Sequence, residues 1–439
     1  MTDEGSEQIP TAAGLSQVAA DGDLEAQARL AEIYVDSGRT AEALPLLQAA
    51  AAAGHVFSAA QLGAWYIIGH LVEQDVGKGF GLVERAGRGG DEISQTFLAT
   101  LCAAGTGTKA NPAKAIGWLV RAAKQGHARA LRQLGCLVPT AAKSSASRRL
   151  LLGLAAERGD DIAQYFLGKL LYLSGDPDER RQAISWCSLA ARAGNPAASR
   201  FLAVNDLEPS NQLPAQIVTT PVIWSRLKKS LKLPHRATGI GETVLREQPR
   251  ISTFKGFLDD DLCDYVMAAA APYLKPATVN DSHRGMDVLD PSRSNSMMGF
   301  FPIENDVIIN SIYRRIADRV GFPVEHGEVL GVLHYLPGQR YAPHYDFFDP
   351  DYPVHAAEIA AGGQRFKTVL VYLNEEYEAG ETLFGKLDWK FKGGRGDALL
   401  FNNVTPDGGV DRQTLHAGLT PTSGQKWIIS LWIRDQAQR

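Results

Sequence analysis

Cysteine is scarce in this chain of 439 residues, which has only four. The cysteines lie far apart and form no C-x-x-C pair, so their spacing argues against a zinc ribbon, a dithiol redox motif and a disulfide scaffold. We expect them to be buried free thiols. They are Cys102, Cys136, Cys187 and Cys263.

Two further features are missing from the sequence. No stretch is apolar for long enough to span a bilayer, and the acidic start MTDEGSEQIP lacks the basic segment and apolar core of a secretory signal. We therefore expect a cytoplasmic protein with no membrane partner. The formal net charge of -4 gives no support for nucleic acid as a partner.

The remaining composition describes a globular protein. Hydrophobic residues make up 45% of the chain and charged residues 21%, which is sufficient for substantial cores. The length is comfortable for two domains. We expect a multidomain α + β protein.

The N-terminal half contains a repeat marked by glycines at intervals of 32 to 36 residues. Each interval holds two short Ala-rich helical patterns, and glycine ends the second helix where the chain must reverse. After a flexible tail over residues 1–20, about five units should stack as an α-solenoid over residues 21–205. A Pro/Ser/Ala loop at 138–147 interrupts the array. The marking glycines are Gly22, Gly54, Gly90, Gly126, Gly159 and Gly194.

Residues 206–248 predict a proline-containing linker with one short helix. From Pro249 onward the sequence predicts a second domain, at 249–439. It begins with a strand and a helix capped by Asp259 or Asp260, and continues with an amphipathic helix within 305–321 and eight short strands. This spacing favours a barrel-like double sheet of the jelly-roll type with flanking helices.

One short motif in this domain, APHYDFFDP, places a histidine and an acid two positions apart. On a strand, His344 and Asp346 would project to the same side. His416, on a later predicted strand, would supply a third ligand. Two imidazoles and one carboxylate that leave open positions are the donor set of non-haem Fe(II) oxygenases. We therefore predict a catalytic iron site.

Lys426 is a candidate for binding a cosubstrate. It follows His416 by ten positions, and strand alternation in QKWIISLWIRD places Lys426 and Trp432 on one face. A buried lysine is costly without an anionic partner. The distal carboxylate of a dicarboxylic acid such as 2-oxoglutarate would provide that partner.

Both halves of the chain resemble known families. The pattern of 21–205 is similar to the Sel-like branch of the tetratricopeptide repeats. Residues 249–435 resemble the prolyl 4-hydroxylase branch of the 2-oxoglutarate and Fe(II)-dependent dioxygenases. The matching stretches are PRISTFKGFLDDDLCDYV, RSNS, LHYLPGQRYAPHYDFF, GGQRFKTVLVYLNEEYEAGETLF, GDALLFNN and LHAGLTPTSGQKWIISLWIRD.

The second resemblance implies a reaction and a set of residue roles. It implies Fe(II), 2-oxoglutarate, O₂ and ascorbate, with hydroxylation of a peptidyl residue, most often proline, and release of succinate and CO₂. The iron ligands would be His344, Asp346 and His416, and Lys426 would hold 2-oxoglutarate. The resemblance also implies cosubstrate contacts from Tyr335 and Thr382 and substrate contacts from Tyr341, Arg365 and Trp432.

Two departures from the family pattern accompany this resemblance. Arg434 stands where some relatives have histidine near the substrate, and EAGETLFG replaces the more usual GGETxFP. The first leaves the substrate open, so a free amino acid or a small metabolite is an alternative. A catalytically idle repeat scaffold is a second alternative. The repeats are expected either to recruit a polypeptide substrate or to cover an apolar flank of the oxygenase domain.

Overall fold

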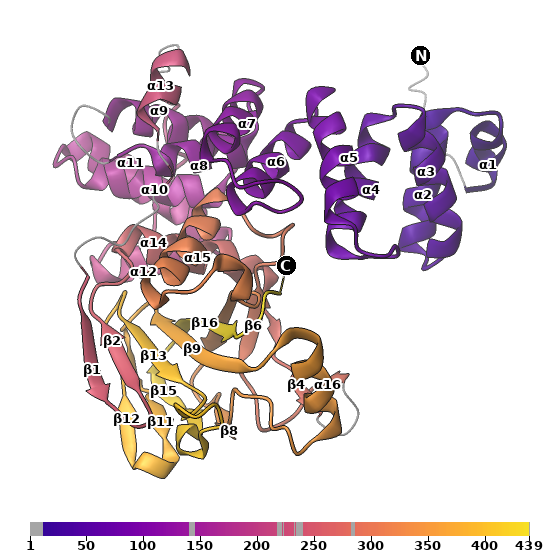
Figure 1. Ribbon diagram of the computed structural model, residues 1–439. Helices are drawn as coiled ribbons and strands as arrows, with labels where there is room; N and C mark the ends of the chain where they lie inside the picture. The colour runs from indigo at the N-terminus through magenta and orange to yellow at the C-terminus, as the bar shows by residue number, and fades with distance from the viewer. Residues whose placement is uncertain are drawn as a thin grey trace. The chain divides into compact units, whose positions relative to one another are not determined.

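The computed structural model describes residues 12–139, 145–216, 222, 224–231, 233, 240–281 and 286–438. These residues form two compact units (Figure 1). The first contains the described residues up to Leu151 together with α13. The second contains those from Leu152 to 216 and from Leu233 onward. Residues 140–144 of the loop predicted at 138–147 lie outside the described residues, and its last three positions are helical, because α9 begins at Ser145.

The first unit is an array of short helices joined by a recurring junction. A glycine with positive φ ends one helix, and the next residue, such as Asp23 or Asp91, accepts a hydrogen bond from the start of the following helix. All six glycines predicted to mark the repeat have this positive φ. The helices are α1 (Ala12–Ala20), α2 (Leu24–Asp36), α3 (Thr40–Ala52), α4 (Val56–Ile68), α5 (Val76–Arg88), α6 (Glu92–Ala104), α7 (Pro112–Lys124), α8 (Ala128–Leu137), the part of α9 (Ser145–Ala156) before Leu152, and α13 (Trp224–Ser230).

Helix α1 corrects one prediction. The sequence predicted a flexible tail through residue 20, whereas residues 12–20 are helical. Leu15 and Ala19 are buried in a cluster with Ala26 and Leu30 of α2. This small apolar stripe is enough to pack one more helix against the array.

The second unit begins with three more helices of the repeat type. They are α10 (Asp161–Tyr172), α11 (Pro177–Arg192) and α12 (Pro196–Val204). A β-carbon on Gly168 of α10 would lie 2.5 Å from Sγ of Cys187 in α11, so these helices can approach as they do only with glycine at this position. Cys187 is free and buried, as are Cys102 and Cys263, in agreement with the predicted thiols, whereas Cys136 is only partly buried.

The rest of the second unit is built on an eight-stranded sheet of order β1-β2-β13-β9-β16-β7-β6-β3. In Figure 1, α14 and α15 lie on one side of this sheet. Asp259 caps α14, as the sequence predicted. The strands and helices are β1 (Glu242–Arg246), β2 (Ile251–Phe254), β3 (Lys275–Pro276), β6 (Ser296–Gly299), β7 (Gly331–Tyr335), β9 (Arg365–Tyr372), β13 (Ala398–Asn402), β16 (Lys426–Arg434), α14 (Asp260–Ala270) and α15 (Val307–Val320).

A four-stranded sheet of order β12-β11-β14-β8 completes the double sheet that the sequence predicted. Phe384 of this sheet packs on Phe401 of the larger one, within a shared buried core. The two sheets therefore enclose the space between them in the manner of a jelly roll. The strands are β8 (Tyr341–His344), β11 (Thr382–Phe384), β12 (Trp389–Phe391) and β14 (His416–Gly418).

Several elements were missing from the prediction. The segment predicted as a linker contains β1, whose five residues are all exposed. Such an edge strand is held by backbone pairing to β2 and shows no apolar alternation. The remaining elements are β4 (Val279–Asp281), β5 (Met286–Val288), β10 (Tyr377–Ala379), β15 (Pro421–Gly424) and α16 (Pro353–Gly362). Across the described ranges, no helix is long and apolar enough to cross a membrane.

Candidate active site

The structure brings the three predicted iron ligands together between the sheets. His344 is the last residue of β8, His416 is the first of β14, and the two are paired directly across the strands. Their Nε2 atoms lie 3.5 Å and 3.4 Å from the two carboxylate oxygens of Asp346. One ligand atom from each residue falls within 4.8 Å of the others. The prediction that Asp346 continues the strand is wrong, because β8 ends at His344.

Backbone carbonyls orient both imidazoles. Nδ1 of His344 lies 2.9 Å from the carbonyl oxygen of Ala342, and Nδ1 of His416 lies 2.9 Å from that of Thr414. Because a carbonyl oxygen can only accept, Nδ1 carries the proton in each ring. In the neutral form of each imidazole, Nε2 then offers its lone pair on the side of Asp346, as metal binding requires.

Asp346 is buried and is fixed by a hydrogen-bonded chain. The hydroxyl of Thr368 donates to Asp346 at 2.7 Å, and Nδ2 of Asn403 donates to that hydroxyl at 2.9 Å. Burial by itself would raise the pKa of Asp346, but His416, His344 and Thr368 outweigh it and hold this pKa well below its usual range. The carboxylate is thus ionised and ready to bind a cation.

Lys426 lies in the same space, and its surroundings suit an anionic ligand. The side chain is fully buried, and among the residues that the structure describes its Nζ has no hydrogen-bond partner. Burial lowers the pKa of Lys426 to about 7. A recess holds Lys426 together with the triad, Tyr335 and Thr382. A dicarboxylate that reached from the triad to Nζ would satisfy both groups.

The two residues predicted to contact the cosubstrate line this recess from different sheets, Tyr335 from β7 of the eight-stranded sheet and Thr382 from β11 of the four-stranded sheet. Tyr335 is paired with Lys426 across β7 and β16, and its ring centre lies 5.0 Å from Nζ. The hydroxyl of Thr382 lies 2.8 Å from that of Tyr372. The structure thus places both residues beside Lys426, and their contact with 2-oxoglutarate stays a prediction.

A wider cavity of about 500 Å³ adjoins this recess, and His344 and Asp346 line both. It is lined by the three residues predicted to face substrate. The ring of Tyr341 stacks on His344 at 3.5 Å, and the guanidinium of Arg365 lies 3.8 Å from the ring centre of Trp432. His355 of α16 also lines this cavity. His326 and His334 contact Arg434 O and Gln425 instead.

Arg434, the residue that departs from the family pattern, is held by an ion pair. It is buried, and its Nε donates to Glu328 at 2.7 Å. The same carboxylate accepts two hydrogen bonds from Arg365, at 2.6 and 2.8 Å. Burial raises the pKa of Glu328, but the two arginines lower it more. Glu328 therefore orients Arg365 against Trp432, at the wall of the cavity.

Replacing Glu328 by glutamine should destabilise the protein by about 3 kcal/mol, because two largely buried guanidinium groups lose their shared anion. Chemical denaturation would measure this change. Glu358→Gln is the matched control, since within the described ranges Glu358 forms an ion pair only with Arg434, and its side chain is 52% exposed. We expect less than about 1 kcal/mol from the control. Equal effects of the two changes would contradict the role given to Glu328.

Sequence reasoning missed Glu328, Thr368 and Asn403. Each acts through a partner that is distant in the chain, such as the 106 positions between Glu328 and Arg434. Thr368 directly precedes the apolar run VLV of β9, which was a weak signal of an inward-facing hydroxyl. The other two carried no local signal.

The double sheet, the His-Asp-His triad and the buried lysine define a 2-oxoglutarate-dependent, non-haem iron oxygenase. Comparison with known proteins agrees: residues 330–434 match the 2OG-Fe(II) oxygenase superfamily. Residues 56–91, 93–127 and 161–195 match the Sel1 repeat. The chain belongs to the 2OG-Fe(II) oxygenase superfamily, as a prolyl 4-hydroxylase-like enzyme with N-terminal Sel1 repeats.

Individual relatives cover the C-terminal domain. Probable prolyl 4-hydroxylase 10 of Arabidopsis thaliana is 37% identical over 210 residues, which are 44% of this chain and 71% of the relative. Prolyl 4-hydroxylase 1 of the same plant is 35% identical over 216 residues, or 46% of this chain and 75% of the relative. The family and the triad together imply Fe(II) and 2-oxoglutarate.

Solved structures are similar to each half of the chain. A viral collagen prolyl hydroxylase from Paramecium Bursaria Chlorella virus-1 is 31% identical and covers 42% of this chain and 95% of its own, with a TM-score of 0.33. A Sel1 repeat protein from Oxalobacter formigenes is 27% identical and covers 42% of this chain and 79% of its own, with a TM-score of 0.38.

Proposed function

We propose that this protein hydroxylates a residue of a polypeptide, with proline as the preferred target. The observation that carries the proposal is the open cavity of about 500 Å³ beside the triad. A second hollow of about 350 Å³ shares Arg293, Trp432 and Arg434 with it. Together they offer more room than a free amino acid needs, and they suit the residues that flank a target in a peptide.

Different residues of the chain would bind the metal, the cosubstrate and the substrate. Fe(II), when bound by His344, Asp346 and His416, would supply the oxygen chemistry. Lys426 would bind the far carboxylate of 2-oxoglutarate and so fix its orientation toward the metal. Trp432, whose buried Nε1 has no hydrogen-bond partner within the described part of the chain, would donate to a substrate carbonyl. Ascorbate would support turnover, as in the family.

The test is a coupled measurement on the purified full chain with Fe(II) and 2-oxoglutarate. Proline-containing peptides should gain the mass of one oxygen in proportion to the succinate formed. Succinate formed only with free proline or another small molecule would favour a metabolite hydroxylase. No succinate with any substrate, under conditions where Fe(II) binds, would favour the idle scaffold.

We further propose that the repeats recruit the polypeptide. Two apolar side chains, Phe57 of α4 and Ile93 of α6, occupy equivalent positions in successive repeats, each two residues after the cap. They are 45% and 66% exposed. A repeated exposed apolar position on a helical array suits an extended polypeptide partner.

The recruitment proposal has its own test. Phe57→Ser combined with Ile93→Ser should raise the KM for an intact protein target about tenfold and leave the KM for a short peptide unchanged. Mass spectrometry of cell extracts with and without the enzyme would first identify that target by a gain of one oxygen. Equal kinetics of the double variant and the wild-type protein on the intact target would show that this surface does not recruit it.

A further inference from the structure

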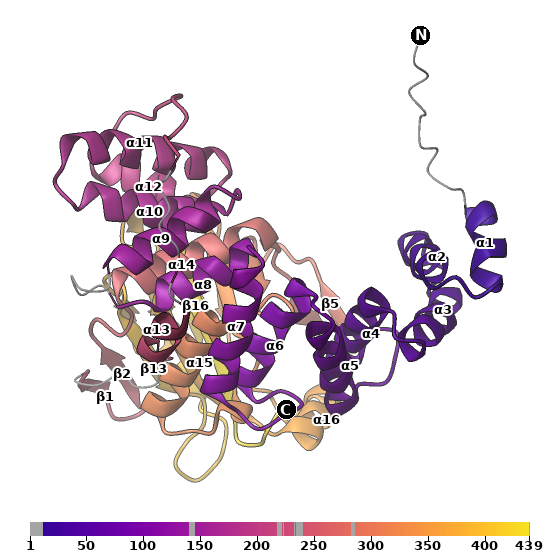
Figure 2. The ribbon, with the colours of Figure 1, turned by 90° about the horizontal axis from the view of Figure 1, so that it is seen from above.

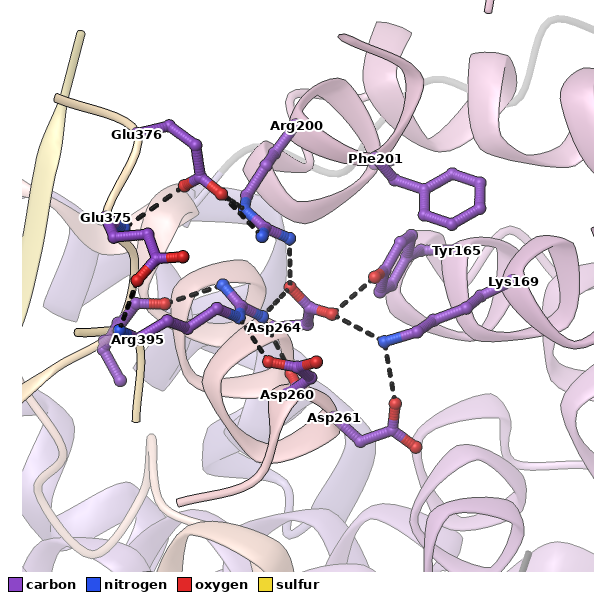
Figure 3. Close-up of polar contacts among 12 residues, drawn as sticks. Tyr165, Lys169, Arg200, Phe201, Asp260, Asp261, Asp264, Glu375, Glu376 and Arg395 are labelled. Carbon is purple, nitrogen blue, oxygen red and sulfur yellow. Dashed lines mark hydrogen bonds and ion pairs between the residues drawn. The ribbon is translucent and has the colours of Figure 1, made fainter. Parts of the chain in front are cut away.

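A buried carboxylate joins the last repeat helices to the oxygenase fold within the second unit (Figure 3). Asp264 of α14 is 1% exposed. It accepts hydrogen bonds from the Tyr165 hydroxyl at 2.5 Å and from Lys169 at 3.0 Å, both in α10. Arg395, just before β13, donates at 2.6 Å, and Arg200 of α12 lies 3.7 Å away. In Figure 2 these helices also lie together, with α10 and α12 beside α14.

The pKa shifts of the groups around Asp264 indicate that their contacts with this carboxylate are permanent. Burial and the negative charge of Asp264 raise the pKa of Tyr165, so the phenol remains a donor. Burial by itself would lower the pKa of Arg395, but Asp264 outweighs it and raises this pKa above its usual value. Removing the repeat helices would leave a buried carboxylate with fewer partners, which is costly.

Both arginines, Arg200 and Arg395, also contact the segment that connects β9 to β10. Nε of Arg200 donates to Glu376 at 2.8 Å. Nη1 of Arg395 donates to the carbonyl of Leu373 at 2.7 Å, and its backbone N–H donates to Glu375 at 3.1 Å. The segment 373–376 is therefore fixed both by Arg200 of the last repeat helix and by Arg395 of the oxygenase fold.

The same segment is hydrogen-bonded to the residues on either side of Lys426. Nδ2 of Asn374 donates to the carbonyl of Gln425 at 2.7 Å, and the amide of Trp427 donates to Oδ1 of Asn374 at 2.9 Å. The amide of Leu373 also donates to the carbonyl of Trp427 at 2.9 Å. Since Nζ of Lys426 has no partner among the described residues, its position depends on the backbone that Asn374 holds.

We infer that the last repeat helices position Lys426 for 2-oxoglutarate, through Arg200, Glu376 and Asn374. Arg200 is thus a positioning residue, contributed by the repeats, that acts on cosubstrate affinity. The inference rests on the proposed binding of 2-oxoglutarate by Lys426. It gives the final repeat a function in the reaction that differs from substrate recruitment.

Lys169 provides a matched control for Arg200. Both cations lie on repeat helices, both approach Asp264, and their side chains are 19% and 23% exposed. Only Arg200 contacts the segment that leads to Lys426, because the other partner of Lys169 is Asp261 of α14. A packing role predicts similar consequences for the two residues, and a positioning role predicts different ones.

The experiment measures 2-oxoglutarate binding to the full chain by calorimetry, with Mn(II) as an unreactive stand-in for the metal. Arg200→Met should weaken 2-oxoglutarate binding roughly tenfold and leave Mn(II) affinity unchanged, since it loses a charge-assisted hydrogen bond. Arg200→Lys should recover part of the loss. Lys169→Met should keep the wild-type affinity for 2-oxoglutarate even if its melting temperature falls.

A second variant, Glu376→Ala, tests the inference independently if Arg200→Met does not fold. Glu376→Ala leaves Asp264 untouched and should weaken 2-oxoglutarate binding as Arg200→Met does, with no additional loss in the double variant. Wild-type affinity in both variants, or an equal loss with Lys169→Met, would overturn the inference. A wild-type protein that binds Mn(II) but no 2-oxoglutarate would overturn the proposed function, and the inference with it.

Discussion

Replacing His344, Asp346 or His416 by alanine will remove Fe(II)-dependent succinate formation, by about a hundredfold or more, while the protein stays folded. The three side chains converge within 4.8 Å and no other group in the described residues forms such a cluster of metal-binding atoms. Loss of one donor therefore leaves the metal with too few protein ligands. Succinate assays and metal analysis of each purified variant would measure the effect.

The matched control for this prediction is His355→Ala. His355 lines the same cavity but accepts a hydrogen bond from the backbone of Asp349 and takes no part in the triad. It should retain Fe(II) binding. Full activity in any triad variant with confirmed purity would remove that residue from the iron site. The Asp346 variant is the most informative, because Thr368 and Asn403 would then be left without the carboxylate that they orient.

Lys426→Ala should raise the 2-oxoglutarate requirement at least about tenfold and leave metal binding unchanged. The ammonium group is fully buried, is not one of the metal-binding groups, and is unpartnered within the described chain. Losing a buried charge pair with the cosubstrate corresponds to ~2–5 kcal/mol. Titration of 2-oxoglutarate in the succinate assay, and of Mn(II) by calorimetry, would separate the two affinities.

The control here is Lys392→Ala, because Lys392 is a nearby cation whose Nζ donates to the backbone carbonyl of Tyr377. An unchanged 2-oxoglutarate requirement in Lys426→Ala would assign the distal carboxylate to a different cation. Arg365 is poorly placed for that role, since Glu328 already accepts two of its hydrogen bonds.

The pH dependence gives a second readout for Lys426. Burial lowers its pKa to about 7 from an ordinary value of 10.5. Without cosubstrate, the folded state therefore binds fewer protons than the unfolded state between these values, and stability rises with pH across that window. Binding of a dianion restores the charged form. Above about pH 7, 2-oxoglutarate binding should take up a proton and weaken as pH rises, which calorimetry in buffers of different ionisation enthalpy would detect.

Local sequence patterns predicted much of the fold and of the candidate active site of this protein. The recurring glycines predicted the helical array because a reversal with positive φ requires glycine, and the structure confirms all six. Strand alternation placed Lys426 and Trp432 on one face, and both reach the site. The spacing of His344, Asp346 and His416 selected the triad, because the chemistry of iron limits which residue types can hold it.

Tertiary structure decided how these parts are held. Asp346 joins the triad from a bend beyond β8, where Thr368 of β9 fixes it. Tyr165 and Asp264 meet across 99 positions, so the last repeat helices share a compact unit with the oxygenase strands. Helical and strand periodicities report only which face of an element is buried. They carry no information on which distant element covers that face, because the partner is selected by the packing and charge of the whole fold.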